Sequence, residues 1–116
     1  MTPSEFGDII LVPFPFTDQT TSKKRPAVVI SSAAYNTERP DLIIMAVTSQ
    51  IKPTASIGEV IVQGWQEVGL LKPSAIKPVI TTIEKTLVIK TMGRLSEDDQ
   101  KAMQQSLKAI LGRKDY

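Results

Sequence analysis

Short apolar runs separated by polar turns make up most of the chain. The runs are rich in valine, isoleucine and leucine, and their lengths are typical of buried strands. Val60 and Val62 alternate with other residues, which predicts a strand with one buried face. The pattern predicts strands over residues 8–14, 26–31, 42–48, 59–63, 79–83 and 87–89.

The segments between these runs contain turn residues. Residues 33–41, with Asn36 and Pro40, are expected to form a turn-rich connection. Residues 64–71 predict a single helical turn closed by Gly69, with Pro73 ending it. The two last strands are expected to join through residues 84–85.

The end of the chain has the pattern of a helix. Ser96 is a good N-cap, and Asp99, three residues on, predicts a near capping box. Apolar residues recur at helical spacing and predict one buried face. These residues are Met103, Leu107, Ile110 and Leu111. Several short strands and one terminal helix predict a mainly β fold, a small barrel with a C-terminal α-helix, as a single domain over residues 1–116.

One connection is longer and more polar than a scaffold hairpin needs. Residues 17–25 join the first two strands and contain hydroxyl side chains followed by Lys23, Lys24 and Arg25. Long loops on rigid strands often carry function. This composition favours a loop that holds an anion.

Composition removes several kinds of chemistry. The chain has no cysteine and no histidine, so a thiolate metal site, an imidazole base and a histidine-containing triad are excluded. The acidic residues show no metal-ligand spacing, so we expect neither a metal nor another cofactor. The net charge of +2 does not by itself indicate a nucleic-acid binder.

Nothing in the sequence predicts a membrane segment. The longest apolar run, residues 42–47, is too short to cross a bilayer. Residues 1–5 lack the basic and apolar regions of a signal peptide. We therefore expect a soluble, cytoplasmic protein that has no membrane partner.

Several short motifs together resemble one protein family. They occur in order along residues 6–111, nearly the whole chain, and their joint spacing is more specific than any one alone. They are Gly7-Asp8, Arg25-Pro26-Ala27-Val28-Val29-Ile30, Val47-Thr48-Ser49-Gln50, Gly69-Leu70-Leu71-Lys72-Pro73-Ser74, Ile83-Glu84-Lys85 and Gly93-Arg94-Leu95-Ser96. Through these motifs the chain resembles the MazF/PemK/Kid family of toxin endoribonucleases, particularly PemK-like growth inhibitors.

The resemblance implies an SH3-like β-barrel that forms a homodimer. It also implies a toxin of a type II toxin–antitoxin system, an mRNA interferase that cuts single-stranded RNA sequence-specifically without metal, and a cognate antitoxin that blocks the RNA groove. The family's catalytic arginine and its threonine or serine correspond to Arg25 and Thr48. Residues 13–18 depart from the family pattern, which affects the expected RNA sequence preference.

Other residues near these two are candidates for RNA contact. A hydroxyl, an amide or an ammonium group can bind a phosphate or a base edge. The candidates are Thr17, Lys23, Lys24, Ser49, Gln50 and Lys52. Phe14 and Phe16 are candidates for stacking on a base or for the core. No good general base is evident, although Asp18 and Asp41 are carboxylates in neighbouring loops.

Each candidate taken alone also has an ordinary structural interpretation without a functional role. An arginine before a strand is usually solvated, and a threonine at a strand end usually caps the backbone. Two other function classes also remain open: a CcdB-like gyrase poison or adaptor that binds a protein without catalysis, and an RNA-binding homologue that has lost activity. Trp65 is most simply a core residue.

Overall fold

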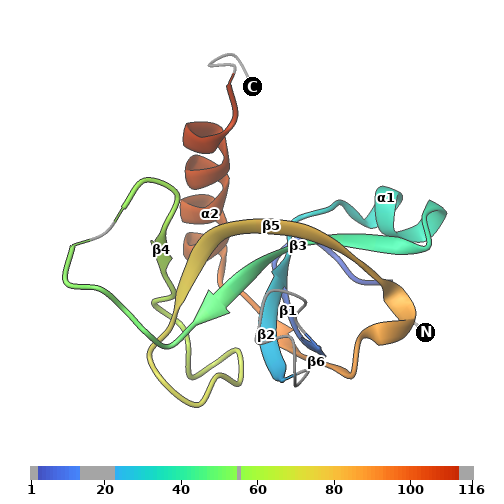
Figure 1. Cartoon of the computed structure of the whole chain (residues 1–116), viewed down its shortest axis with the longest axis horizontal. Coiled ribbons are helices and arrows are strands. Elements are labelled where there is room, and N and C mark those ends of the chain that lie inside the picture. The colour runs from blue at the N-terminus through green and yellow to red at the C-terminus, as the bar shows by residue number, and fades with distance from the viewer. Residues whose placement is uncertain (1–2, 14–22, 55, 113–116) are drawn as a thin grey trace.

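A strongly curled antiparallel sheet forms the body of the molecule, and one long helix packs against it (Figure 1). The computed structural model describes residues 3–13, 23–54 and 56–112. The six strands lie in the order β4-β5-β3-β2-β1-β6. Their bounds are β1 Asp8–Pro13, β2 Lys24–Val29, β3 Asp41–Thr48, β4 Val60–Ile61, β5 Ala75–Glu84 and β6 Lys90–Arg94; the helices are α1 Ala33–Glu38 and α2 Glu97–Ile110. The predicted mainly β fold with a C-terminal helix is confirmed.

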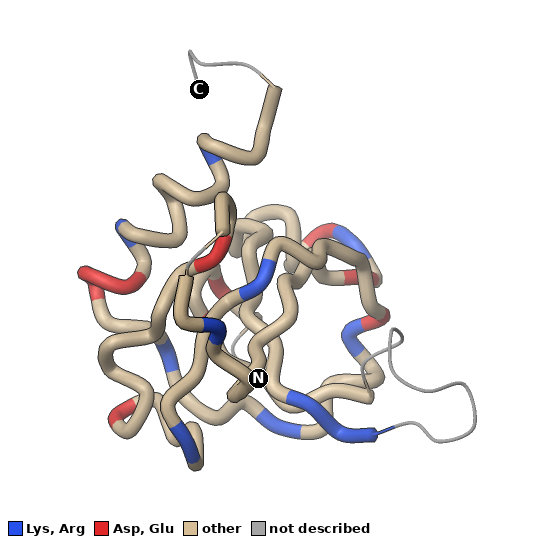
Figure 2. Tube along the Cα trace, turned by 60° about the vertical axis from the view of Figure 1, so that its left-hand side comes forward, with Lys and Arg blue, Asp and Glu red and all other residues tan. Residues whose placement is uncertain are grey.

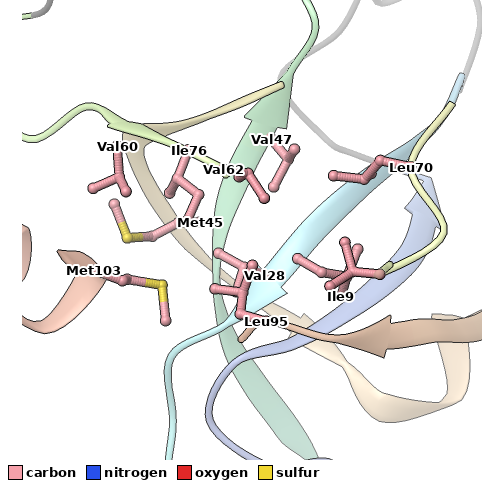
Figure 3. Close-up of a cluster of buried hydrophobic side chains, with 11 residues drawn as sticks. Ile9, Val28, Met45, Val47, Val60, Val62, Leu70, Ile76, Leu95 and Met103 are labelled. Carbon is pink, nitrogen blue, oxygen red and sulfur yellow. The ribbon is translucent and has the colours of Figure 1, made fainter. Parts of the chain in front are cut away.

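Both faces of the curled sheet are apolar. Successive strand residues point to opposite faces, so Ile9 and Val28 join one buried cluster while Ile10 and Val29 join another. The first cluster also contains Met103 of α2, and Figure 3 shows its side chains between the strands and the helix. The second cluster is smaller and lies on the other face of the curled sheet. Burial on both faces explains why the strands read as continuous apolar runs.

The C-terminal helix begins where the sequence predicts. Ser96 is the N-cap, and its hydroxyl accepts a hydrogen bond from the backbone N–H of Asp99. Met103 is fully buried, and Leu107 and Ile110 pack partly buried against the same cluster. Leu111 is 45% exposed and follows the last helical residue, so the predicted apolar face ends one residue early.

The capping box was wrong in one respect. Both carboxylate oxygens of Asp99 accept hydrogen bonds from backbone N–H groups of another segment, Gln63 at 3.1 Å and Gly64 at 2.9 Å. Asp99 is 1% exposed. The side chain therefore joins α2 to the turn at residues 63–69 instead of closing on Ser96.

Two other segments differ in structure from the prediction. The turn-rich connection contains α1, because the side chain of Ser32 caps a short helix by accepting from the N–H of Tyr35. The strand predicted over residues 87–89 does not form: Leu87 ends a 3₁₀ turn, Lys85–Leu87, and β6 begins only at Lys90. Residues 64–71 contain the predicted single turn: the N–H of Val68 donates to the carbonyl of Gly64 at 3.3 Å, and Gly69 ends the turn with φ +86°.

Strand β5 is longer than predicted and irregular. It pairs with β3 along its length, but the register shifts between Ile80, opposite Met45, and Lys77, opposite Ala46. Pro78 and Val79 lie in this β-bulge. The two-residue strand β4 pairs only with the first residues of β5, Ala75 and Ile76.

An ion-pair cluster fixes β6 to the N-terminal segment. Arg94 Nε donates to Asp8 at 2.8 Å, and Arg94 Nη2 donates to Glu5 at 2.8 Å. The hydrogen bond that Arg94 donates to the Asp8 carboxylate, with a smaller contribution from the one to Glu5, raises the pKa of the Arg94 guanidinium above its ordinary value. Within the described chain no helix is long and apolar enough to span a membrane.

Candidate functional site

A pocket of about 360 Å³ opens at one end of the sheet. The end of β1, the start of β2 and the end of β3 meet there because neighbouring strands are antiparallel. Segment 70–74 and β6 complete the wall. The lining residues are Leu11, Lys24, Arg25, Pro26, Val47, Thr48, Ser49, Gln50, Leu70, Leu71, Lys72, Ser74 and Met92.

The two predicted catalytic residues, Arg25 and Thr48, both line this pocket. Arg25 was expected at the end of a loop, but β2 begins at Lys24, so Arg25 lies within the strand opposite Val12. Its side chain is exposed. A strand holds the backbone of Arg25 more firmly than a loop would.

Thr48 is half-buried at the last position of β3. Its Oγ1 accepts a hydrogen bond from the backbone N–H of Gln50 at 3.1 Å. A hydroxyl has one donor and two acceptor positions. The contact therefore orients the Thr48 hydroxyl and leaves its proton available to a bound molecule.

The pocket is positively charged. Lys24, Arg25 and Lys72 line it, and no carboxylate does among the residues that the structure describes. Figure 2 shows the continuous blue stretch of residues 23–25 on the side of the molecule away from the red first turn of α2. Hydroxyl, amide and cationic groups without acid suit an anionic ligand such as a phosphate.

Only some of the other predicted contact residues line the pocket. Lys24, Ser49 and Gln50 line the pocket. Lys23 and Lys52 are exposed but are not among its lining residues. Thr17 lies outside the described residues, as do Phe14, Phe16 and Asp18.

Asp41 does not belong to the site. It starts β3, whereas Thr48 ends it, and the ends of a strand of 8 residues are about 23 Å apart at the usual rise. The Asp41 carboxylate instead lies 3.6 Å from Arg39 and accepts from the hydroxyl of Tyr35 at 3.5 Å. Within one chain, Asp41 is therefore too far from Thr48 to act as a general base there.

Sequence reasoning missed the contribution of segment 70–74. Lys72 and Ser74 supply polar groups to the pocket, and Leu70 and Leu71 supply apolar surface. The motif from Gly69 to Ser74 was a signal, because it is part of the family resemblance, but no chemistry was assigned to it.

The described residues favour neither a metal centre nor an aromatic groove. They contain no group of three or more acidic side chains placed to hold a metal ion. No aromatic residue is among those lining the pocket in the described part of the chain. Trp65 instead packs partly buried against the larger core cluster, as predicted.

Comparisons with solved structures identify the same fold in known toxins. An endoribonuclease from a Mycobacterial species, solved in complex with its cognate antitoxin, superposes with a TM-score of 0.75 at 15% identity, covering 97% of this chain and 96% of that one. MazF in a MazE-MazF crystal structure from Deinococcus radiodurans superposes at 0.73 with 21% identity, covering 95% and 96%. The Mycobacterium tuberculosis toxin MazF-mt6 superposes at 0.70 with 17% identity, covering 87% and 92%.

The sequence itself gives a more direct assignment. It has no match among curated proteins. Residues 5–111 match the family described as PemK-like, MazF-like toxins of type II toxin-antitoxin systems. Because this match spans nearly the whole chain, and the fold agrees with it, the chain belongs to the PemK-like, MazF-like toxin family.

Proposed function

We propose that the chain is a metal-independent endoribonuclease that cleaves single-stranded RNA as the toxin of a type II toxin–antitoxin system. The observation that carries this proposal is the position of Arg25 and Thr48 in one cationic pocket that no described carboxylate lines. Membership of the toxin family supports the same activity.

The reaction uses the 2′-hydroxyl of RNA as the nucleophile. Its oxygen forms a bond to the adjacent phosphorus while the bond from phosphorus to the 5′-oxygen breaks. The 2′-hydroxyl loses a proton and the leaving 5′-oxygen gains one, so the products are a 2′,3′-cyclic phosphate and a 5′-hydroxyl end. DNA lacks the nucleophile and is not cleaved.

Arg25 stabilises the negative charge that develops on the phosphoryl oxygens. A guanidinium stays charged at all relevant pH values and donates two parallel hydrogen bonds to a phosphate. Strand β2 holds the Arg25 backbone, and the Arg25 side chain lines the pocket with a permanent positive charge. In this proposal Arg25 also shares a proton with the leaving oxygen as that oxygen becomes basic.

Thr48 positions the scissile phosphate. The N–H of Gln50 occupies one acceptor position of the Thr48 hydroxyl, and the hydroxyl proton is donated to a non-bridging oxygen. No described carboxylate lines the pocket. In this proposal a water molecule therefore accepts the proton that the 2′-hydroxyl loses. Such a catalyst depends mainly on positioning and charge and is slow without a histidine base.

We further propose that a cognate antitoxin binds this toxin and that the toxin acts as a homodimer in the cytoplasm, each chain being one domain. Two observations support the antitoxin. The family is defined by toxin–antitoxin systems, and similar structures include a toxin in complex with its cognate antitoxin. Co-purification with the product of a neighbouring small gene tests this partner.

Cleavage in the presence of EDTA tests the activity. Purified protein is incubated with mixed single-stranded RNA, and the product ends are sequenced and analysed chemically. We expect cyclic-phosphate and 5′-hydroxyl ends from the natural protein and from a Lys101→Ala control on the exposed side of α2. Arg25→Ala should cut the RNA about a hundredfold to a thousandfold more slowly.

Other outcomes would support the competing functions. Cutting that is unchanged in Arg25→Ala would indicate a contaminating nuclease and overturn the proposal. RNA that is bound but never cut would identify an inactive RNA-binding homologue. Growth inhibition that persists in the double variant Arg25→Ala, Thr48→Ala, with gyrase recovered in pull-downs, would identify a protein-binding toxin.

A further inference from the structure

We propose that segment 70–74 is a second RNA-binding wall of the pocket. In this arrangement Lys72 binds a backbone phosphate next to the scissile one, and Asp99 is a positioning residue that holds the segment in place. The inference rests on the proposed function, because it takes the pocket to be the RNA site. It assigns roles to two residues that lie outside the predicted site.

The first step is the location of Lys72. It lines the same pocket as Arg25, although the two residues come from different parts of the fold. Lys72 is exposed, and no described residue forms an ion pair with it. An ammonium group at the mouth of an acid-free pocket neutralises a phosphate as a point charge.

The neighbour of Lys72 adds a second kind of contact. Leu71 also lines the pocket and is 91% exposed. The adjacent Leu70 also borders the pocket but is buried in the larger core cluster. A cation beside an exposed apolar side chain fits a nucleotide, which offers a phosphate and a base face.

The second step is the anchor of the turn at residues 63–69, which leads into the segment. The carboxylate of Asp99 accepts from the N–H groups of Gln63 and Gly64 at 3.1 and 2.9 Å. Its own backbone N–H donates to the capping hydroxyl of Ser96. Asp99 thus ties the turn before Leu70 to the first turn of α2. A buried carboxylate with two backbone donors is held rigidly.

The turn is closed by contacts that leave little freedom. Gly69 has φ +86°, a conformation that L side chains rarely adopt. The N–H of Leu70 donates to the carbonyl of Trp65 at 3.0 Å. A Cβ at Gly93 would lie only 2.9 Å from the carbonyl oxygen of Val68, so β6 packs directly on the turn.

The end of the segment is also fixed. The hydroxyl of Ser74 donates to the carbonyl of Lys72 at 2.8 Å. The carbonyl of Ser74 accepts from the N–H of Val62 at 2.9 Å. The backbone of Lys72 is therefore preorganised, which reduces the entropy lost when it binds a ligand.

Binding tests the role of Lys72 independently of cleavage. The probe is a short RNA with a single 2′-deoxy substitution at the cleavage position, which binds but cannot react. Lys72→Gln should weaken its affinity about fivefold, as expected for one exposed charge pair. The slope of log K against log salt should fall by about 0.7 for the lost phosphate contact.

The matched control is Lys101→Gln, which removes an exposed lysine from α2. It should change neither the affinity nor the slope. Equal slopes for Lys72→Gln and the natural protein would overturn the role of Lys72. This outcome differs from failure of the proposed function, which is absence of cleavage of ordinary RNA by the natural protein.

Steady-state kinetics test the role of Asp99. Asp99→Asn replaces an acceptor by an amide group that faces backbone N–H donors, so the turn should shift. We expect KM to rise at least threefold while kcat stays within twofold, because Arg25 and Thr48 lie on other strands.

Asp98→Asn is the control, since Asp98 is the exposed neighbour of Asp99. It should leave both kinetic constants unchanged. A folded Asp99→Asn variant with an unchanged KM, or with equal losses in kcat and kcat/KM, would overturn the positioning role. If Asp99→Asn unfolds, the affinity of the probe for Gly69→Ala tests whether the turn that Asp99 anchors positions Lys72, because a side chain at φ +86° disturbs that turn. An unchanged affinity would overturn the positioning role.

Discussion

Arg25 and Thr48 lie two residues beyond a paired position of the β2–β3 ladder, Ala27 opposite Ala46. The ladder ends at that pair, and both residues lie beyond it at the same end of the sheet. The sheet itself therefore brings the two side chains to one pocket, although 22 residues separate them along the chain.

Arg25→Ala should lower the cleavage rate of single-stranded RNA by about a hundredfold to a thousandfold, the usual effect of removing one donor to a developing oxyanion. Arg25→Lys should restore only part of the rate, because an ammonium lacks the planar fork. Single-turnover cleavage measures both. Circular dichroism should show unchanged folding, since the Arg25 side chain is exposed. Full activity of Arg25→Lys would contradict the proposed bidentate contact.

Thr48→Val should reduce the rate about tenfold to a hundredfold, the effect of losing a hydrogen bond to a charged group. Valine keeps the shape of threonine but removes the hydroxyl that accepts from Gln50. Thr48→Ser keeps the hydroxyl and should retain most activity. The comparison of these two variants in the same cleavage assay separates the hydroxyl from the methyl group.

Lys24 and Lys52 should differ in their effect on RNA affinity. Lys24 lines the pocket and Lys52 does not. Lys24→Gln should therefore weaken binding of the deoxy-substituted probe by a few-fold, about 1 kcal/mol or less, while Lys52→Gln should have a smaller effect. Fluorescence anisotropy at constant salt measures both affinities. A larger effect of Lys52→Gln would place the RNA on another path.

Met103→Ala should lower the free energy of unfolding by about 2–5 kcal/mol, the cost of deleting a large side chain from a packed core. Met103 is fully buried between α2 and the sheet. Leu111→Ala should change stability by less than about 0.5 kcal/mol, because Leu111 is nearly half exposed. Urea denaturation followed by circular dichroism compares the two.

Arg94→Met should destabilise the protein by an amount that is independent of pH across the neutral range. The pKa of Arg94 is raised by Asp8 and Glu5, so the stabilisation is complete below the ordinary arginine value. It is lost only when pH rises through the still higher value of the folded state. Urea unfolding of the natural protein and the variant at about pH 6 and pH 9 should give the same difference. A difference that shrinks at the higher pH would contradict this assignment.

The fold was largely predictable, because strands and helix repeat their apolar residues at characteristic spacings. Ser96 and Met103 identified α2 in this way. The helix α1 was missed because it depends on one capping contact of Ser32 within a polar segment. Such a short helix has too few apolar positions to show a period.

The site was predictable only in part. Arg25 and Thr48 were found through their motifs and share a pocket. Asp41 lies at the opposite end of β3 from Thr48, and nearness in sequence to a strand says nothing about which end of the sheet a residue reaches. The positions of Lys72 and Asp99 depend on how the turn at residues 63–69 packs on α2 and β6, and no local pattern encodes that contact.

The bulge in β5 has a consequence for colloidal stability. Beyond Ile76, the outer side of β5 has no partner strand in the described chain, and exposed strand edges tend to recruit other molecules into amyloid-like sheets. Pro78 lies in the bulge and offers no N–H to an incoming strand. The irregular backbone there thus interrupts the free edge of β5 and hinders an incoming strand from pairing along it.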